Sequence, residues 1–566
     1  MTKRPRSLTF AVDERPNNAS LTVLAVQHAA LSAVFLVYAA VVAKGAGFNL
    51  VQQQAMVVGT LLSCGIGAMI QAGAPRFSTG LLIIPISSPM FVIFGIPAGQ
   101  EAGPAGIATL AVVGGLMQIF VGQMLRRVRK FFPPEVCGVV VLMLGMSIVP
   151  LAIKRIAGHQ GDSASVLEIP SIITGLATLA TIIICAVWLK GSKRHFAMLI
   201  GCAVGYGFAA TFGMLDQFSS FASEASYFSL PNFVLPDFSL NWSFILTYMV
   251  VAMIAATDSM GVIISTDRLD DADWSKPNIP QISKGISSLG LTTILSCLLG
   301  GTHLGFSATN TGLAFATGVT SRIVGLVAGA IMIAISFFPK ILVLVIAMPE
   351  PILGGILAYA GSYFIVSGAQ LSLSRMLSPR RLIVVGLSVG LGVGLQSNPE
   401  LVAGVDGVLG IFLQSPLLTA SVSVIILNAV MLLGIAQKAS IEVMPGAERH
   451  EQVESTFEGW GELWGLKPAT MVQASQVTNQ LLEAVSEFAE GPIRLEARHD
   501  DLNIDISIIY RGQPMIFPDR APTPEELLED PDGMARMSGW LVRHLASKAT
   551  PFSRDGLQGV LLRFES

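Results

Sequence analysis

The segment SATNTG, residues Ser307–Gly312, interrupts an apolar stretch at a point where a helix should be crossing lipid. A second interruption, SSPMF at Ser87–Phe91, lies in an earlier apolar stretch. Its proline removes a backbone donor and disfavours helix in the residue before it. Non-helical backbone at membrane depth survives only where it is buried or lines a cavity. The two segments therefore predict a binding site between broken helices.

The composition of the chain indicates that lipid surrounds most of it. Of the 566 residues, 52% are hydrophobic and 13% are charged, whereas a soluble protein carries about 25% charged residues. Long apolar blocks alternate with short polar ones until about Gln437, after which charged residues become frequent. We therefore predict a polar tail over residues 1–19, a membrane domain over 20–437 and a soluble domain over 450–566.

Fourteen segments come close to the roughly 20 mostly apolar residues that a spanning helix needs. The third, tenth and thirteenth are short or broken by proline and glycine. The predicted spans lie near residues 20–43, 50–72, 79–97, 105–125, 133–153, 168–189, 195–214, 241–264, 283–300, 303–318, 320–338, 341–366, 381–396 and 410–435.

Charge in the connections predicts how the spans are oriented. Connections after even-numbered spans carry 13 Lys and Arg residues, and those after odd-numbered spans carry about four. Lys and Arg concentrate in cytoplasmic loops, so both termini and the C-terminal domain are expected in the cytoplasm. The protein itself is expected in the inner membrane of the cell. The polar connection from about Leu215 to Leu240 has no Lys or Arg and is expected to face outward.

Ionisable groups within the spans are candidate functional residues, because charge in hydrocarbon is costly. Asp258 lies two-thirds of the way along the eighth span, and Gln27 and His28 lie in the first. The alternative to a functional role is that Asp258 only pairs with a neighbouring helix for packing. For His28 the alternative is an interior group that is merely hydrogen-bonded. The polar sites in spans 1 and 8 and the interruptions in spans 3 and 10 are each seven spans apart, which predicts two inverted seven-span repeats.

Four blocks of the sequence resemble the nucleobase–ascorbate transporters, also called the uracil/xanthine permeases. The resemblance covers roughly residues 20–436. The blocks are Gln27–His28; Val58–Leu62 running to Ser87–Phe91; Phe132–Gly138 followed by Leu144–Ser147; and Thr309–Gly312 with Thr317–Arg322.

The resemblance implies an all-α polytopic membrane protein and a site. It implies fourteen spans in two inverted repeats, a core and a gate domain, and a homodimer that imports a nucleobase with a coupling proton or Na⁺. No catalytic residue, metal site or other cofactor is expected. The substrate-binding residues that it implies are Asp258, Thr309, Asn310, Ala308, Ser88, Pro89, Met90 and Phe91, and we expect Asp258, His28 and Gln27 to take part in coupling.

The chemistry of a nucleobase suits such a site. Its edge alternates N–H donors with C=O acceptors, so a carboxylate can accept from the ring and fixed backbone amides can donate to it. Apolar or aromatic side chains can cover the ring faces. Burial would also bring a carboxyl group towards neutrality, which makes Asp258 a candidate for proton coupling.

Three departures from the family pattern leave the substrate open. Asp258–Val262 reads DSMGV where the family usually has Glu-Ser-x-Gly-Asp, Thr309 replaces Gln or Glu, and Pro89 replaces an aromatic residue. The ending TGVTSR, Thr317–Arg322, looks more like purine members, such as those for xanthine or urate, than uracil members. A purine is therefore preferred, and uracil remains the alternative.

Other functions fit the sequence less well. An anion transporter with the same seven-plus-seven fold is opposed by the acidic Asp258. A membrane sensor is opposed by the lack of a catalytic output motif, and an enzyme by the lack of a nucleophile–base pair or metal-ligand cluster. No basic stretch interleaved with aromatic residues indicates nucleic-acid binding.

The C-terminal sequence predicts a small α+β domain. We expect a helix over 470–490, strands over 493–498 and 502–510, a helix over 534–548 and a strand over 559–564. This order resembles the GHKL class of ATPase domains, especially the anti-sigma kinases. The positions of the expected magnesium and adenine residues, Glu487 and Tyr510–Pro514, lack the required side chains, so we expect a non-catalytic, regulatory or structural domain.

Overall fold

The structure is a computed structural model of the chain. It describes residues 4–5, 8–124, 133–158, 168–224, 226–230, 237–239, 242–272, 277–374, 379–405, 407–431, 437–443, 449–464, 466, 468–486, 489–499, 503–518, 520–523, 527, 533–545, 548–554 and 556–565. The chain divides into two compact units, of which the first holds residues 1–371 and 388–422 and the second holds 372–387 and 423–566.

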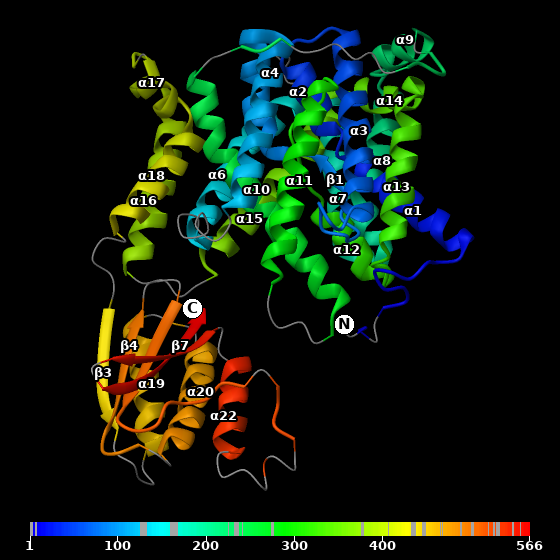
Figure 1. Ribbon diagram of the computed structural model, residues 1–566. Coiled ribbons are helices and arrows are strands. Elements are labelled where there is room, and N and C mark those ends of the chain that lie inside the picture. The colour runs from blue at the N-terminus through cyan, green and yellow to red at the C-terminus, as the bar shows by residue number, and fades with distance from the viewer. Residues whose placement is uncertain are drawn as a thin grey trace. The chain divides into compact units, whose positions relative to one another are not determined.

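Up to residue 431 the described chain is mostly helical (Figure 1). The helices are α1 (Asn18–Val34), α2 (Val37–Gly45), α3 (Leu50–Gly73), α4 (Val92–Gln123), α6 (Pro134–Ile156), α7 (Ile169–Trp188), α8 (Ala197–Thr211), α9 (Asp216–Glu224), α10 (Trp242–Asp270), α11 (Ile279–Leu298), α12 (Ala308–Thr317), α13 (Arg322–Ser336), α14 (Pro339–Ile346), α15 (Glu350–Ser372), α16 (Pro379–Ser397), α17 (Gly407–Gln414) and α18 (Pro416–Met431). Short 3₁₀ helices are η1 (Pro89–Phe91), η2 (Gly191–Phe196) and η3 (Pro399–Leu401), and short strands are β1 (Pro85–Ser87) and β2 (Leu304–Phe306).

Most predicted spans coincide with observed helices, but spans 1, 12 and 14 are each divided between two helices, and the loop from Leu215 also differs from the prediction. Span 12 was expected to begin near residue 341, but α14 ends at Ile346 and α15 begins only at Glu350. Helix α14 is instead bent by 89° from α13, with Pro339 at its first position, where a missing N–H costs nothing. The expected loop from Leu215 contains helix α9.

Within the described residues, seven helices are individually long and apolar enough to cross a membrane, or eight if the bent pair is one span. Several other predicted spans are formed by short or interrupted helices, such as the 10 residues of α12. Helix α4 itself contains a break at Gly103, where φ is +61°, a conformation that favours glycine. This break separates the predicted spans 3 and 4. The total of fourteen spans stays a prediction.

A short strand followed by a helix is found at both predicted interruptions. Non-helical backbone was expected through Gly312, but Ala308–Gly312 form the start of α12, and the break lies before Ser307. Strands β1 and β2 pair antiparallel, with Ile86 opposite Gly305. The pair is extended by hydrogen bonds from the Ser88 amide to the His303 carbonyl at 2.9 Å and from the Ser307 amide to the Ile84 carbonyl at 3.1 Å. Backbone groups that a continuous helix would satisfy internally are therefore satisfied between the two segments.

Close glycine contacts occur twice, in equivalent positions around this strand pair. A Cβ on Gly65 of α3 would lie 2.7 Å from the Gly329 carbonyl of α13, and one on Gly329 would lie 2.6 Å from the Gly65 carbonyl. Gly115 of α4 and Gly290 of α11 have the same reciprocal relation, at 2.7 and 2.5 Å. Two matching helix pairs support the internal repetition that the spacing of the polar sites predicted.

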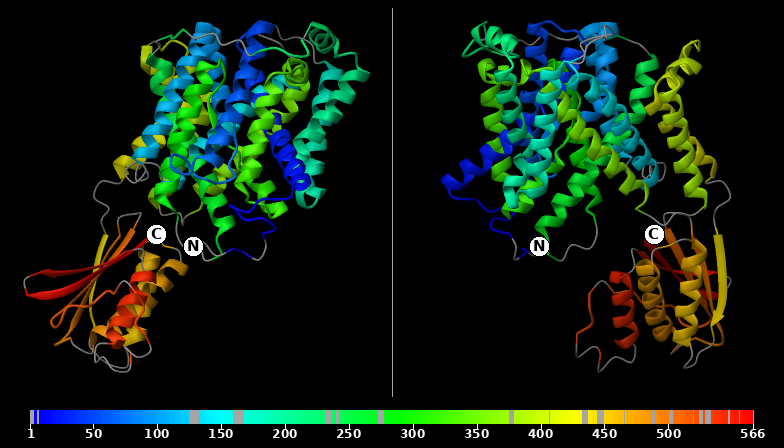
Figure 2. Two further views of the ribbon diagram at one scale, coloured as in Figure 1. Left: turned by 45° about the vertical axis from the view of Figure 1, so that its right-hand side comes forward. Right: turned by 180° about the vertical axis from the view of Figure 1, so that it is seen from behind.

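The C-terminal domain is a five-stranded antiparallel sheet in the order β3-β4-β5-β7-β6. Its elements are β3 (Gln437–Val443), α19 (Arg449–Trp464), α20 (Pro468–Ser486), β4 (Ile493–His499), β5 (Asn503–Tyr510), α22 (Gly533–Leu545), β6 (Lys548–Arg554) and β7 (Leu557–Glu565). The helices lie along one face of the sheet (Figure 2). Buried side chains alternate along β4 and pack against apolar residues of α19 and α20, as expected for a half-buried sheet.

The elements predicted for this domain are present, but three were not anticipated: β3, α19 and β6. Strand β3 lies upstream of residue 450, where the domain was expected to begin, and it forms an edge of the sheet. Glu487 lies outside the described residues. The described residues therefore show a small sheet domain and do not show a GHKL domain.

Candidate functional site

Asp258 lies on a polar stripe that follows one face of α10. Its side chain is exposed, as are Gly261, Ser265 and Arg268 further along the helix. These positions are spaced by three, four and three residues, so they share one face. A face against lipid would be apolar, and this one is not. The stripe therefore indicates a path open to water, running from the middle of α10 towards its C-terminal end.

The predicted substrate residues Ala308, Thr309 and Asn310 lie at the start of α12, which is stabilised by an N-cap residue. The Ser307 hydroxyl accepts from the Asn310 amide at 3.1 Å, as an N-cap residue does. The amides of Ala308 and Thr309 lie in the first turn and have no partner within the helix. Ala308 is exposed and Thr309 is half-buried, so this end of α12 is accessible.

Asn310 and His28 are brought together, 282 positions apart in the chain. The His28 Nδ1 lies 2.8 Å from the Asn310 side-chain oxygen. The Asn310 amide nitrogen donates to the Ser32 and Ser307 hydroxyls at 2.9 and 3.0 Å. All of these groups are buried, so the Asn310 side chain ties α12 to α1.

This network also assigns the histidine tautomer. Since the Asn310 nitrogen donates to two hydroxyls, its oxygen must accept, and His28 Nδ1 carries the proton. Among the described residues no hydrogen-bond partner is present for the buried His28 Nε2 or for the buried Gln27 Oε1. Two adjacent buried acceptors without donors are unusual in a folded protein.

The first broken segment is held by aromatic packing. Phe91 is 1% exposed and packs edge-on against Tyr248 of α10, with ring centroids 5.6 Å apart. Its ring is also parallel to that of His303, at 6.4 Å. Ser88 and Met90 are buried and Pro89 is partly exposed. Phe91, predicted to cover a substrate ring, contacts other protein rings here.

Four residues of this cluster, Gln118, Thr293, His303 and Tyr248, were not identified from the sequence. Gln118 of α4 donates to the Leu304 carbonyl at 2.7 Å and lies 3.1 Å from His303 Nε2, while Thr293 donates to its oxygen at 2.8 Å. A glutamine within the apolar block 105–125 and a histidine just before the second broken segment were the available signals. Tyr248 gave no signal, because one aromatic residue in an apolar span is ordinary.

Helices α10 and α12 are joined at two levels. The Thr266 and Thr311 hydroxyls are 3.0 Å apart, and the Thr320 hydroxyl donates to Asp270 at 2.5 Å. Thr266 precedes Asp270 in the chain, and their partners Thr311 and Thr320 follow in the same order. Helices α10 and α12 therefore run in the same direction. At about 1.5 Å per residue, Asp258 lies about 12 Å before Thr266 and Thr309 about 3 Å before Thr311. The two site residues are thus separated by about 9 Å along the axis.

Residues 19–401 match the xanthine/uracil permease model, which is described as "Permease family". This chain belongs to that permease family. It is 26% identical to the xanthine permease of Bacillus subtilis over 416 residues, 72% of this chain and 92% of that one. It is 27% identical to the uric acid permease PucK of the same organism over 422 residues, 74% of this chain and 96% of that one.

Among solved structures, the transmembrane domain of a cyanobacterium bicarbonate transporter, BicA, matches with a TM-score of 0.47 and 16% identity. The match covers 75% of this chain and 100% of that one. The family assignment makes the permease a multi-pass membrane transporter and not an enzyme.

The permease also has contacts between helices at the end opposite the α10 C-terminus. Glu350 of α15 forms ion pairs with Arg155 of α6 and with Lys44 of α2, the latter at 3.7 Å. Lys44 also donates to the Met348 carbonyl at 2.6 Å. Both cations lie in last turns and the acid in a first turn, which the helix dipoles favour.

Near the other end, His195 of η2 packs over Gly312 of α12. A Cβ on Gly312 would lie 2.7 Å from the His195 ring, so glycine is required for this approach.

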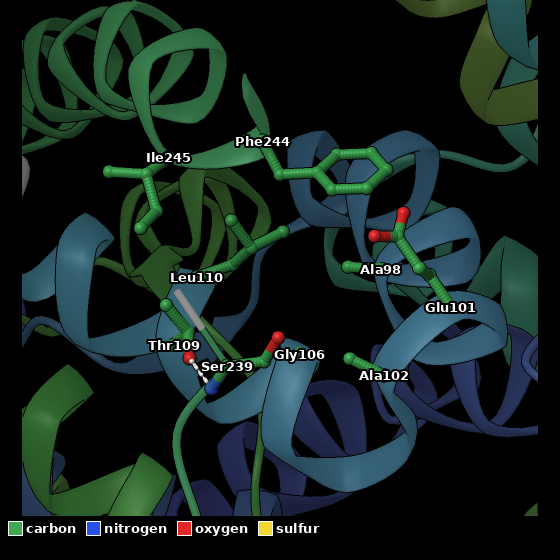
Figure 3. A pocket seen from close by; sticks show the side chains of 9 residues that line it. All are labelled: Ala98, Glu101, Ala102, Gly106, Thr109, Leu110, Ser239, Phe244 and Ile245. Carbon is green, nitrogen blue, oxygen red and sulfur yellow. Dashed lines mark hydrogen bonds between the residues drawn. The ribbon is translucent and has the colours of Figure 1, made fainter. Parts of the chain in front are cut away.

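A cavity of about 10 Å³ lies between α4 and the start of α10, on the side of the Gly103 break (Figure 3). Thr109 accepts a hydrogen bond from the Ser239 amide at 3.0 Å beside it, and Glu101 points towards the Phe244 ring. The cavity has room for about one water molecule. It is lined by none of the predicted substrate residues, so it is not the predicted site.

Proposed function

We propose that this permease imports a nucleobase, with a purine such as xanthine or urate as the preferred substrate, in symport with a proton or Na⁺. One observation carries the proposal: the carboxylate of Asp258 is accessible at the inner end of a polar stripe on α10. The names of the related xanthine and uric acid permeases support a purine. An acidic residue in this position favours a ligand with N–H donors over an anion.

The separation of the two site residues supports a bridging ligand. About 9 Å along the axis is too long for a hydrogen bond between Asp258 and Thr309. A base placed between them could donate ring N–H groups to Asp258 and accept from the Ala308 and Thr309 amides. The positive end of the α12 dipole would strengthen those bonds to carbonyl oxygens.

The first broken segment, together with Gln27 and His28 of α1, completes the proposed site. Ser88, Pro89 and Met90 would supply backbone and apolar surface beside the base, with Phe91 behind them. The buried acceptor of Gln27 lies on the residue directly before His28, which contacts Asn310, and could take a donor from the base. In this proposal Asp258 alternates between ionised and protonated forms, and His28 fixes α12 while lying close to the coupling site.

The proposal keeps the architecture that the resemblance implies. It has fourteen spans as two inverted repeats, core and gate domains, a homodimer in the cell membrane and both termini in the cytoplasm. The C-terminal domain is proposed to be non-catalytic, with a regulatory or structural role. Tight binding of ATP analogues by the purified protein would contradict that last role.

Uptake into proteoliposomes tests the transport proposal. Labelled xanthine, urate, uracil and sulfate should be compared, each with a proton gradient, a Na⁺ gradient or neither. We expect xanthine or urate to accumulate with one of the two gradients. Accumulation of uracil alone would select the uracil alternative, and accumulation of sulfate alone would select the anion transporter.

The Asp258→Asn variant tests the residue that carries the proposal. Loss of charge-assisted hydrogen bonds should lower uptake by ~100-fold. The variant should keep the melting temperature of the unmodified protein, because the side chain is exposed. Asp237→Asn, at an exposed position away from the site, is the matched control and should transport normally. Normal gradient-driven uptake by Asp258→Asn would overturn the mechanism.

A further inference from the structure

The N-terminal segment Leu8–Arg15, expected to be part of a polar tail, is bound to the segment that joins α12 to α13. The Thr9 and Phe10 amides donate to the Gly318 carbonyl at 2.7 and 3.2 Å. In return, the Thr320 amide donates to the Phe10 carbonyl at 2.9 Å. Phe10 and Val319 thus form a parallel β-bridge. We call the segment Leu8–Arg15 the N-terminal clamp.

Further contacts continue the clamp along the chain. The Arg322 amide donates to the Val12 carbonyl at 3.0 Å, and the Ser321 hydroxyl donates to the Glu14 carbonyl at 2.6 Å. Arg322 also forms an ion pair with Asp13 at 2.8 Å. Thr320 and Ser321 are buried beneath these contacts. A segment with this many backbone partners is an ordered part of the membrane domain.

Asp270, the last residue of α10, is where the clamp meets the helices. One of its carboxylate oxygens accepts from the Val12 amide at 3.1 Å and from the Thr320 hydroxyl at 2.5 Å. The side chain is 7% exposed. Asp270 therefore joins the clamp, α10 and the end of α12 through a single atom, Oδ1.

The clamp closes a ring of contacts around α12. It binds at Gly318, which caps α12 in the left-handed conformation with φ of +67°. It then leads into α1, whose His28 holds Asn310 in the first turn of α12. Helix α10 holds α12 at Thr311 and, through Asp270, at Thr320. Both ends of this 10-residue helix are thus fixed by partners from distant sequence.

We propose that Asp270 and the N-terminal clamp are positioning elements for transport, which keep the first turn of α12 in register with Asp258. This inference rests on the proposed function, because it concerns the same site. Asp270 is about 18 Å from Asp258 along α10 at about 1.5 Å per residue, so it acts through α12 and does not touch the substrate. Loosening α12 should weaken substrate binding more than it slows turnover.

Asp270→Ala is the principal test, and uptake kinetics and protease protection are the two readouts. Removing both hydrogen bonds should raise KM by ~10-fold with little change in the maximal rate. Cleavage after Glu14 by a glutamyl endopeptidase should become faster in the purified protein, because the clamp is released. Thr320→Val removes one of the two bonds to Asp270, together with the long 3.4 Å contact of its hydroxyl to the Phe10 carbonyl. It keeps the Val12 bond to Asp270 and should give a smaller change in the same direction.

Two further variants make the test specific. Asp270→Asn keeps the accepting oxygen, so it should restore both KM and protection close to those of the unmodified protein. Asp237→Ala removes an exposed acid outside the clamp and should change neither. A clamp that becomes cleavable in Asp270→Ala while KM stays unchanged would overturn the proposal, and so would an Asp270→Asn variant that behaves like Asp270→Ala.

The outcome is separable from that of the proposed function. If the unmodified protein takes up no nucleobase, the proposed function fails, while the protection of Glu14 still reports whether Asp270 holds the clamp. If Asp270→Ala does not fold, as judged by its elution and melting in detergent, Thr320→Val carries the test. An unchanged KM in a Thr320→Val variant with faster cleavage would then overturn the positioning role.

Discussion

The two broken segments share a backbone design and differ in what holds them. Each is a three-residue strand followed by a helix, and the strands pair with each other. The first is fixed by rings, with Phe91 against Tyr248 of α10. The second is fixed by hydrogen bonds, with Asn310 against His28 of α1.

The two broken segments contribute different features to the proposed site. Backbone geometry is common to both, so either kind of side chain can maintain it. Only the second segment also presents an accessible helix start, at Ala308 and Thr309. The two broken segments therefore share a backbone structure but present different chemical groups, as binding of an asymmetric ligand between them would require.

The largest effect is expected at the apolar contact. Phe91→Ala should remove ~3–5 kcal/mol of stability, because it leaves a cavity among buried rings. Thermal unfolding in detergent would measure the loss. Phe315→Ala, on a side chain that is 70% exposed, is the matched control and should change stability little. A Phe91→Ala variant as stable as this control would show that aromatic packing does not hold the first segment.

A smaller loss is expected at the polar contact. Asn310→Ala should cost ~2–3 kcal/mol, since it leaves His28 Nδ1 without its acceptor and removes one donor from each of the Ser32 and Ser307 hydroxyls. The double variant His28→Ala, Asn310→Ala should be less destabilised than the sum of the single variants, and a double-mutant cycle gives the coupling. Additive losses would mean that the two side chains do not support each other.

The smallest effect is expected on the open stripe. No atom lies within 4 Å of a Cβ built on Gly261, so Gly261→Ala should keep or slightly raise the melting temperature, by up to ~1 kcal/mol of helix propensity. Gly115→Ala, whose Cβ would lie 2.7 Å from the Gly290 carbonyl, should be clearly destabilised. Equal destabilisation of the two variants would contradict an open path along α10.

The sequence located the two helix breaks to within a few residues, although Ala308–Gly312 form the start of α12. It also identified three polar side chains within the spans. Ser87–Phe91 and Ser307–Gly312 stood out because proline, small residues and amides are uncommon in the middle of spans. Asp258, Gln27 and His28 stood out because charge and amides are costly in lipid. The break between α14 and α15 was missed, because the sequence from Ile341 to Pro349 contains no charged residue.

By itself, the sequence determined that this chain is a multi-pass membrane protein with two interrupted helices, because hydropathy and backbone breaking are local properties. Only the tertiary structure decided that Asn310 contacts α1, that Phe91 packs against α10 and that residues 8–15 belong to the membrane domain. Those roles depend on partners far apart in the chain, 282 positions for His28 and Asn310 and 258 for Val12 and Asp270. Local pattern cannot predict such pairs, because many buried groups could satisfy the same donor or acceptor.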